Sequence, residues 1–271
     1  MKHRLVIALF ALFTFGCNPG QGNARFFVFG EDDIEQQIPA ADVADGWTIT
    51  FNRFLVVIGD VELLDSGLDS GLVEADARIY DLTQPGPHLV GLAGGLDAGQ
   101  WSVGFRTPQA TDDTAGQQFV AEFDLELMRD NGYSVFIEGS ATDAGTTKTF
   151  AWGFTDPVRY TRCGGDGAIE ITANGLTPAE LTIVGDRFFR DDLVSPNAAL
   201  RFQPFVLADV DDNGQVTEDE LEAVALSSLS TGNYRTGNAE ASNLGEYVRF
   251  AARSLGALTG AGPCDSTISA P

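Results

Sequence analysis

The sequence predicts a mainly β protein, an antiparallel β-sandwich with a helical addition near its C-terminus. Short segments of alternating apolar and polar residues follow one another through the middle of the chain, separated by turns rich in Gly and Asp. From Ser195 onward the apolar residues change to helical spacing. The 271 residues are 44% hydrophobic, which is enough to bury a core. No Pro- or Ser-rich linker divides the two parts, so residues 25–271 are predicted to form a single domain.

The first residues have the composition of an export signal. Basic residues precede an apolar run from Leu5 to Phe15, which is too short to cross a bilayer. The run ends at Cys17, so residues 1–16 are predicted to be a signal peptide and residues 17–24 a flexible tether. This arrangement resembles the signals of bacterial lipoproteins. The resemblance implies a lipid on Cys17 as the sole membrane contact, and an outer-membrane, cell-surface or periplasmic location; ordinary secretion is the alternative.

The first long strand is predicted to contain a β-bulge. Trp47, Ile49 and Phe51 alternate with polar residues, the phase slips at Asn52–Arg53, and alternation resumes at Phe54. Further strands are predicted at residues 101–105, 133–137, 150–154, 169–171 and 181–183, with a hairpin turn at 142–145.

Two segments between these strands are predicted to differ from them. Residues 119–129 have helical spacing and precede Asn131–Gly132, a pair that commonly ends a helix. The repeated Leu-Asp-Ser-Gly of residues 64–71 predicts a polar surface loop.

The cysteines predict one disulfide. The chain has three Cys, and if Cys17 carries lipid, Cys163 and Cys264 remain as an even pair. Pairing is the default for such cysteines in an oxidising compartment. No His lies near either residue in the sequence, so metal ligation by this pair is disfavoured.

A segment from Asp209 to Glu220 matches the EF-hand calcium loop. A hard cation takes six to eight oxygen ligands, and this loop type supplies them at fixed spacing. Gly214 stands at the sixth position, where the chain must turn sharply. The predicted ligands are the side chains of Asp209, Asp211, Asn213, Thr217 and Glu220 and the backbone carbonyl of Gln215. Calcium is therefore the cofactor that the sequence predicts.

Helices are predicted on both sides of this loop, within an EF-hand-like helix-loop-helix at about residues 195–230. Ser195–Pro196 has the pattern of a helix start, and Thr217 opens the second helix with a Thr-x-x-Glu sequence. EF-hand loops usually pair through their eighth residue, here Val216, but the sequence holds no second loop. We therefore expect Val216 to pack against its own domain. A last helix is predicted at about residues 244–258.

The charge balance narrows the classes of partner. The chain has 16 basic and 39 acidic residues and a net charge of −23. Such a field attracts cations and repels nucleic acid, so no nucleic-acid partner is expected. The sequence identifies no protein or glycan partner.

Four segments follow one another in a recognisable order: residues 44–51 (ADGWTITF), 80–83 (YDLT) and 186–193 (DRFFRDDL), and then the calcium loop. In this order the chain resembles a group of exported lipoproteins of unassigned function and, more distantly, the methanobactin-partner copper-binding β-sandwich proteins. The resemblance implies a β-sandwich that can handle a transition metal. In the copper-binding group the run before the aromatic pair carries His residues, whereas Val184–Arg187 has none here.

The sequence shows no recognisable catalytic constellation, and we expect no enzyme. A Ser-His mechanism would need His88, the one His after the signal peptide, and no Gly-x-Ser-x-Gly motif is present. The first hypothesis is an exported, lipid-anchored calcium-binding protein with a structural or binding role at the cell envelope. The alternative is a protein that binds or acquires copper, and a carboxylate-based hydrolase is the third hypothesis.

Overall fold

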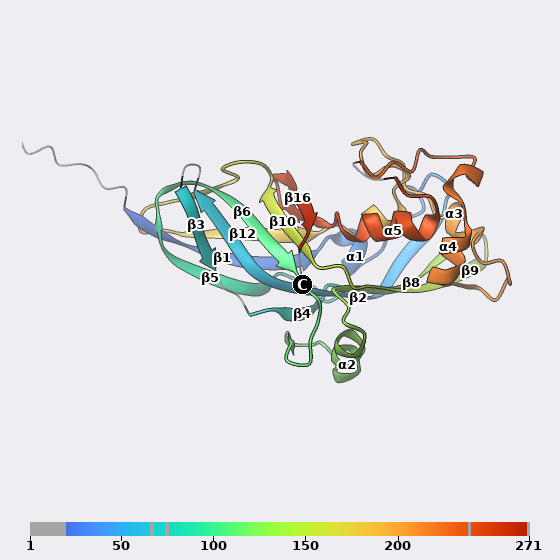
Figure 1. Cartoon of the computed structure of the whole chain (residues 1–271), viewed down its shortest axis with the longest axis horizontal. Coiled ribbons are helices and arrows are strands. Elements are labelled where there is room, and N and C mark those ends of the chain that lie inside the picture. Colours follow the sequence, from blue (N-terminus) through green and yellow to red (C-terminus); the bar gives the residue numbers. More distant parts are fainter. Residues whose placement is uncertain (1–19, 66–67, 74–75, 238–239, 270–271) are drawn as a thin grey trace, which may run out of the picture.

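The computed structural model describes residues 20–65, 68–73, 76–237 and 240–269, and it is mainly β (Figure 1). The predicted signal peptide, Cys17 and residues 18 and 19 of the predicted tether lie outside this part. The remainder of that tether was wrongly predicted, because strand β1 begins at Gln21 and buries Ala24 completely. No helix in the described ranges is long and apolar enough to span a membrane.

The strands form two mixed sheets. The five-stranded sheet has the order β15 (Gly262–Pro263), β14 (Gly256–Leu258), β12 (Leu176–Ile183), β1 (Gln21–Gly30) and β5 (His88–Asp97). The main path of the eleven-stranded sheet is β13 (Gln215–Val216), β9 (Thr146–Phe154), β8 (Val135–Asp143), β2 (Thr48–Asp65), β6 (Gly99–Thr107), β10 (Val158–Cys163) and β16 (Asp265–Ile268). Its remaining strands are β11 (Ile169–Ile171) on β6, β3 (Leu68–Val73) and β4 (Arg78–Asp81) on β2, and β7 (Ala115–Gly116) on β4.

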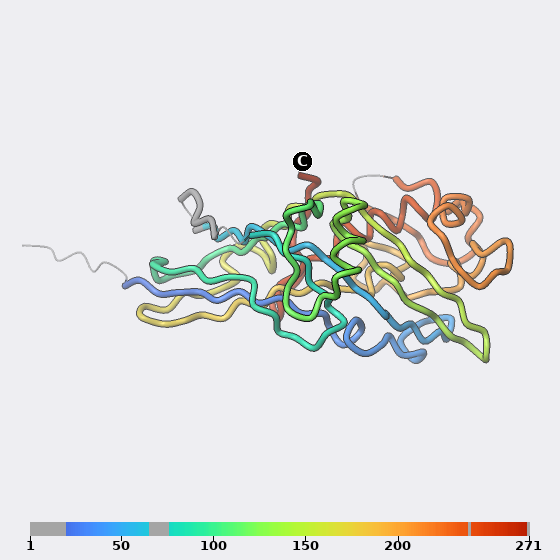
Figure 2. The backbone as a smooth tube through the Cα atoms, turned by 90° about the horizontal axis from the view of Figure 1, so that it is seen from below, coloured from blue at the N-terminus to red at the C-terminus, as the bar shows by residue number. Residues whose placement is uncertain are grey.

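The expectation of purely antiparallel sheets was wrong at three pairings. Strand β1 runs parallel to β12, as do β13 to β9 and β7 to β4. Parallel neighbours need a long connection, and most of the domain lies between β1 and β12. The two strands lie side by side in Figure 2, coloured blue and yellow. Periodicity within a strand carries no information about which distant strand will pair with it.

Both sheets contribute their inner faces to one core. Phe26 of β1 and Leu181 of β12 are buried in the same cluster as Phe105 of β6 and Tyr160 of β10. The layered, mainly β prediction is thus confirmed at the level of two sheets enclosing a shared interior. Because one of the two sheets curls into a half-barrel, the core is enclosed on more than one side.

The predicted bulge is present in β2. Its pairing with β8 shifts register between Phe51 and Arg53, which leaves Asn52 exposed as the extra residue. The shift changes which side chains face the main core, so that Phe54 follows Phe51 into it. The next residue, Leu55, then faces the opposite side of the sheet.

Helix α2 (Glu122–Asn131) covers that opposite side (Figure 1). Its Leu125 and Met128 pack with Leu55, Val57 and Phe136 in a second core. The helix begins three residues after the predicted start and ends at Gly132, in the left-handed conformation that the Asn-Gly pair predicted.

The hairpin turn predicted at 142–145 is confirmed between β8 and β9, with Ala144 and Gly145 at positive φ. The loop predicted at 64–71 was wrong, since β2 continues to Asp65 and β3 pairs with it from Leu68. Among the described strands β3 pairs with β2 alone, and its sequence Leu-Asp-Ser-Gly-Leu-Val does not alternate strictly between apolar and polar residues.

The remaining helices are short. They are α1 (Asp32–Glu35), η1 (Gly185–Phe189), α3 (Gln203–Val206), α4 (Glu218–Ala223), η2 (Leu226–Ser228) and α5 (Leu244–Ala252). In Figure 1, α3, α4 and α5 gather at the end of the molecule beside β8 and β9.

Two helix predictions were too long. No helix starts at Ser195–Pro196, because Ala199 donates its N–H to the Asp191 carboxylate and its carbonyl accepts the Asp191 N–H, so the chain turns back instead. The helix predicted to reach residue 258 ends at Ala252. Residues 256–258 then pair with β12 as β14, and a Cβ at Gly256 would lie 2.6 Å from the Tyr160 ring.

Cys163 and Cys264 form the predicted disulfide across 101 residues. Cys163 ends β10 of the larger sheet, and Cys264 stands where the chain leaves β15 of the smaller sheet for β16 of the larger one. The bond therefore fastens the two sheets where the chain crosses between them. A disulfide of this kind indicates a compartment outside the cytoplasm.

Candidate metal centre

Three carboxylates converge in the predicted calcium loop between α3 and α4. One oxygen each from Asp209, Asp211 and Glu220 lies within 4.8 Å of the others. No other group of three Asp, Glu, His or Cys side chains within the described ranges meets this condition. Carboxylate oxygens are the ligands that calcium prefers, so the donor set fits the ion that the sequence predicted.

The turn of the loop is held by its own side chains. The two oxygens of Asp209 accept the N–H groups of Asn213 and Gly214, at 3.1 and 3.0 Å. Asn213 in turn accepts the N–H of Gln215 through its side-chain oxygen at 2.7 Å. Gly214 has φ of +86°, a conformation that a side chain would strain. These bonds hold residues 213–215 in a turn against the Asp209 carboxylate.

The last predicted ligand also caps helix α4. One oxygen of Glu220 accepts both the N–H and the hydroxyl of Thr217, at 2.9 and 2.8 Å. Thr217 accepts the Glu220 N–H in return, which completes the predicted capping box. This reciprocal pair fixes where the Glu220 carboxylate stands relative to the start of α4.

The outcome for the six predicted ligands is mixed. Asp209, Asp211 and Glu220 come together, and the Asn213 amide donates to Asp211 at 2.9 Å. Gln215 and Thr217 contribute loop hydrogen bonds through their backbone N–H groups. The three carboxylates thus form a group that could hold a metal ion, and ligation by Asn213, Gln215 and Thr217 stays a prediction.

The loop packs against strand β9 of its own domain. Val216 is fully buried, and β13 pairs in parallel with β9, which puts Val216 opposite Phe150. The Thr149 N–H donates to the Gly214 carbonyl at 2.8 Å, and the Trp152 indole N–H donates to the Val216 carbonyl at 2.9 Å. The expectation that Val216 packs against its own domain is confirmed.

A lysine at the loop was missed by the sequence reasoning. The Lys148 ammonium lies 2.5 Å from Asp209 Oδ2 and 3.2 Å from Asp212 Oδ1. Lys148 is 61 residues from Asp209 and reaches the loop only through the pairing of β9 with β13. It is the one Lys in the sequence after Lys2, which is the only signal that could have singled it out.

This contact shifts both groups toward their charged forms. The hydrogen bond from Lys148 holds the pKa of Asp209 below its ordinary value, and the N–H groups of Gly214 and Asn213 add to the effect. The hydrogen bond to Asp209 likewise raises the pKa of Lys148. The first ligand of the loop is thus ionised and already shares a cation.

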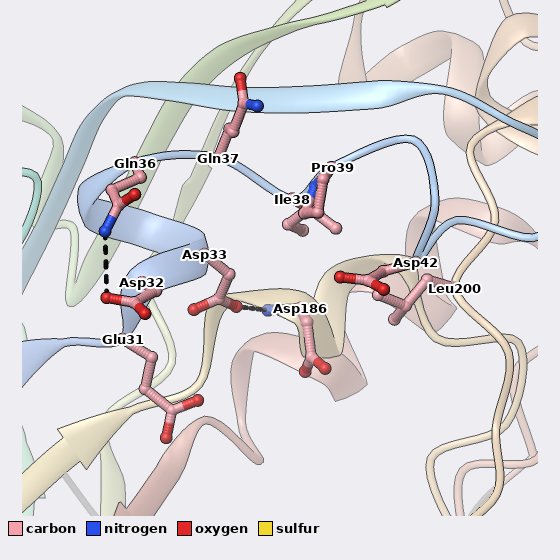
Figure 3. A pocket seen from close by; sticks show the side chains of 10 residues that line it. All are labelled: Glu31, Asp32, Asp33, Gln36, Gln37, Ile38, Pro39, Asp42, Asp186 and Leu200. Carbon is pink, nitrogen blue, oxygen red and sulfur yellow. Dashed lines mark hydrogen bonds between the residues drawn. The ribbon is translucent and has the colours of Figure 1, made fainter.

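A second acidic cluster, also missed, lines a cavity of about 780 Å³ beside α1 (Figure 3). Asp33 accepts the N–H of Asp186 through Oδ2 at 2.8 Å, while its Oδ1 is buried without a hydrogen-bond partner. Burial, together with the charges of Asp186 and Glu31, raises the pKa of Asp33 to about 7. The sequence signal was the run of three acids from Glu31 to Asp33, which reads equally well as a solvated turn.

His88, the imidazole considered for a transition metal, lies on β5. Its Nε2 is 3.1 Å from the Gln84 carbonyl, and its ring packs near Tyr80. His88 is therefore occupied by its own neighbours and is absent from the carboxylate centre.

The chain has no significant match among protein-family models, curated proteins or solved structures.

Proposed function

We propose that this chain is an exported calcium-binding protein in which the ion fastens the C-terminal helical region to the sheet. The convergence of Asp209, Asp211 and Glu220 in an EF-hand sequence that packs on β9 carries this proposal. The ion would be held by those carboxylates, and its charge would offset their mutual repulsion. The net charge of −23 favours a cation as ligand, and the disulfide fits an exterior where calcium is plentiful.

A bound ion would act on a well-defined junction. Before the loop, Phe205 of α3 stacks on Trp152 of β9, with ring centroids 5.4 Å apart. After the loop, α4 buries Leu221, and its Glu222 pairs with Arg249 of α5. Each side of the loop is thus attached to a different part of the domain. An ion that stiffens the loop would stiffen the junction between them, which suits a structural role at the cell envelope.

Metal analysis and calorimetry test the ion. Protein purified without a metal-binding tag should contain calcium, and after chelation it should bind one calcium per chain. Glu220→Gln should weaken binding strongly, because it removes one charge from the last carboxylate. Asp219→Asn is the matched control, since Asp219 is exposed and carries the same charge within the same loop. Stoichiometric copper or zinc in place of calcium would overturn the proposal and favour the alternative.

The anchor is a separate part of the proposal and rests on the sequence around Cys17. Cys17→Ser should release the protein from the membrane fraction in soluble form, because a lipid on this residue would be the only membrane contact. Asn18→Ser, at the next residue, provides a control that keeps Cys17 and the disulfide intact. Unchanged membrane association of Cys17→Ser would leave ordinary secretion as the explanation.

One observation favours the third hypothesis, a carboxylate-based hydrolase. Asp33 faces a cavity and has a pKa of about 7, which suits a group that donates a proton at neutral pH. Asp186 and Glu31 would be its ionised neighbours. Hydrolysis of glycosides that is lost in Asp33→Asn and kept in Asp42→Asn would support this function; activity equal in both variants would exclude Asp33 as the acid.

A further inference from the structure

We propose that Lys148 is a tethered cation that holds the calcium loop folded when calcium is absent and lowers the affinity of the loop for calcium. This inference rests on the proposed calcium site and concerns how that site is tuned. It follows from three properties of Lys148: its burial, its rigid attachment, and the carboxylate that it shares with the ion.

Burial makes this ion pair unlike those on the surface. The side chain of Lys148 is 8% exposed and that of Asp209 is fully buried. Water therefore screens their attraction poorly, and each group depends on the other for neutralisation. Asp212, the second carboxylate near the Lys148 ammonium, is almost fully exposed, so its attraction to Lys148 is screened by water and contributes little.

The backbone of Lys148 is also held in place by the sheet. Lys148 lies within β9, where it pairs with Ala141 of β8. The next residue, Thr149, donates its N–H to the Gly214 carbonyl and so ties the backbone beside Lys148 to the loop. With its backbone fixed in this way and its side chain buried, Lys148 has little room to leave Asp209. The geometry is that of a built-in cation rather than of a surface side chain that visits the loop.

The shared carboxylate sets up a competition. Asp209 accepts Lys148 through Oδ2 and is also one of the three carboxylates whose oxygens converge. A divalent ion placed among them would share Asp209 with the ammonium, and two cations on one poorly screened carboxylate repel each other. Lys148 therefore weakens calcium binding. Without calcium, however, Lys148 is the cation that neutralises the buried Asp209.

Removal of the lysine charge should therefore have opposite effects on the two states. The calcium-free protein loses the cation that pairs with Asp209, so it should melt at a lower temperature. The calcium-bound protein loses a repulsion, so it should bind calcium more tightly. A lysine that served only to pack the loop would lower both stability and affinity.

This tuning suits a loop that stays folded whether or not calcium is bound. A loop already folded around its own cation gains charge balance and stiffness from calcium but changes shape little. Affinities in the range of 10⁻⁴–10⁻³ M suffice for exported modules, and Lys148 would keep the site in that range.

The experiment measures calcium affinity by calorimetry and melting temperature in chelator for Lys148→Met in the otherwise intact protein. We expect calcium binding at least about tenfold tighter than in the wild type, together with a lower melting temperature in chelator. Lys148→Gln, which keeps a hydrogen-bond donor, should show the same tighter binding if Lys148→Met fails to fold. Lys148→Arg keeps the charge and should stay within about threefold of the wild-type affinity.

Arg25→Gln is the control for net charge, because Arg25 is an exposed basic residue on β1 and its loss changes the total charge equally. It should leave calcium affinity unchanged. Equal or weaker calcium binding in both Lys148→Met and Lys148→Gln would overturn this inference while the calcium site itself stands. Calcium binding by neither the wild type nor these variants would overturn the proposed function and the inference together.

Discussion

The calcium loop and the cavity beside α1 both gather carboxylates, yet the pKa values of their central acids move in opposite directions. Asp209 is held below its ordinary pKa, because the Lys148 ammonium and loop N–H groups stabilise its charge. Asp33 has no ammonium or guanidinium partner within hydrogen-bond distance among the described residues, and burial among other acids raises its pKa to about 7. One cluster thus keeps its charge with a cation, whereas the other takes up a proton.

This difference indicates that the loop at Asp209 suits a bound cation, whereas the cavity at Asp33 destabilises negative charge. A loop that carries donors and a fixed cation is organised around negative charge, and calcium can replace repulsion with ligation. The cavity beside α1 leaves Oδ1 of Asp33 without a partner, so every deprotonation there costs stability. The number of acidic residues in a cluster therefore says little about its function unless the hydrogen-bond donors and cations around each carboxylate are known.

The largest expected effect concerns the disulfide, which encloses residues 209–220 but not Asp33. The Cys163–Cys264 bond closes a loop of about 100 residues that contains the calcium site, and chain entropy assigns such a loop up to about 4.7 kcal/mol. Cys163→Ala/Cys264→Ala should lower the free energy of unfolding by several kcal/mol in denaturant titration. Free thiols at both positions in unreduced, denatured wild-type protein would contradict the bond.

The next effect tests the strained cluster. The folded-state pKa of Asp33 is raised from 3.8 to about 7, so the folded protein binds a proton that the unfolded chain has released. The stabilisation that comes from this bound proton is complete below about pH 4 and is lost as the pH rises through 7. Asp33→Asn should therefore have a free energy of unfolding roughly 1–4 kcal/mol above that of the wild type at pH 8 and equal to it near pH 4. The melting temperatures of the two proteins should differ in the same direction.

Asp42→Asn is the control for this comparison, because Asp42 lines the same cavity but is exposed. It should shift melting little at either pH. A pH-independent difference between Asp33→Asn and the wild type would show that packing, and not ionisation, governs this cavity.

The smallest effect tests how the calcium loop is coupled to the sheet. Val216→Ala removes buried methyl groups from the residue opposite Phe150 and should cost about 2 kcal/mol of stability, with weaker calcium binding. Val210→Ala alters the same loop at a side chain that is 77% exposed and should change neither quantity. Equal melting of the two variants would show that the loop is not supported by β9.

The sequence predicted those features whose information is local. The convergence of Asp209, Asp211 and Glu220, the phase slip at Asn52 and the turn at Gly145 each depend on residues that are close in the sequence, and each is present in the structure. The helix expected after Ser195 failed because the Asp191 carboxylate accepts the N–H of Ala199 that the helix would have used. Local propensity could not anticipate that competition.

The missed features all depend on distant pairings. Lys148 meets Asp209 across 61 residues, and Asp33 meets Asp186 across 153. Both contacts follow from which strands become neighbours, and hydrophobic periodicity does not determine that choice. The charges that decide the behaviour of each cluster were therefore visible only in the fold.

The central claim, that calcium stabilises this protein through Asp209–Glu220, is tested most directly by thermal melting in chelator and in millimolar calcium. A ligand that binds only the folded state at a hundred times its dissociation constant adds about 2.7 kcal/mol. We expect the melting temperature to rise by several degrees with calcium, to rise less with magnesium, and to lose most of this gain in Glu220→Gln but not in Asp219→Asn. Identical melting of the wild type in chelator and in calcium would contradict the claim.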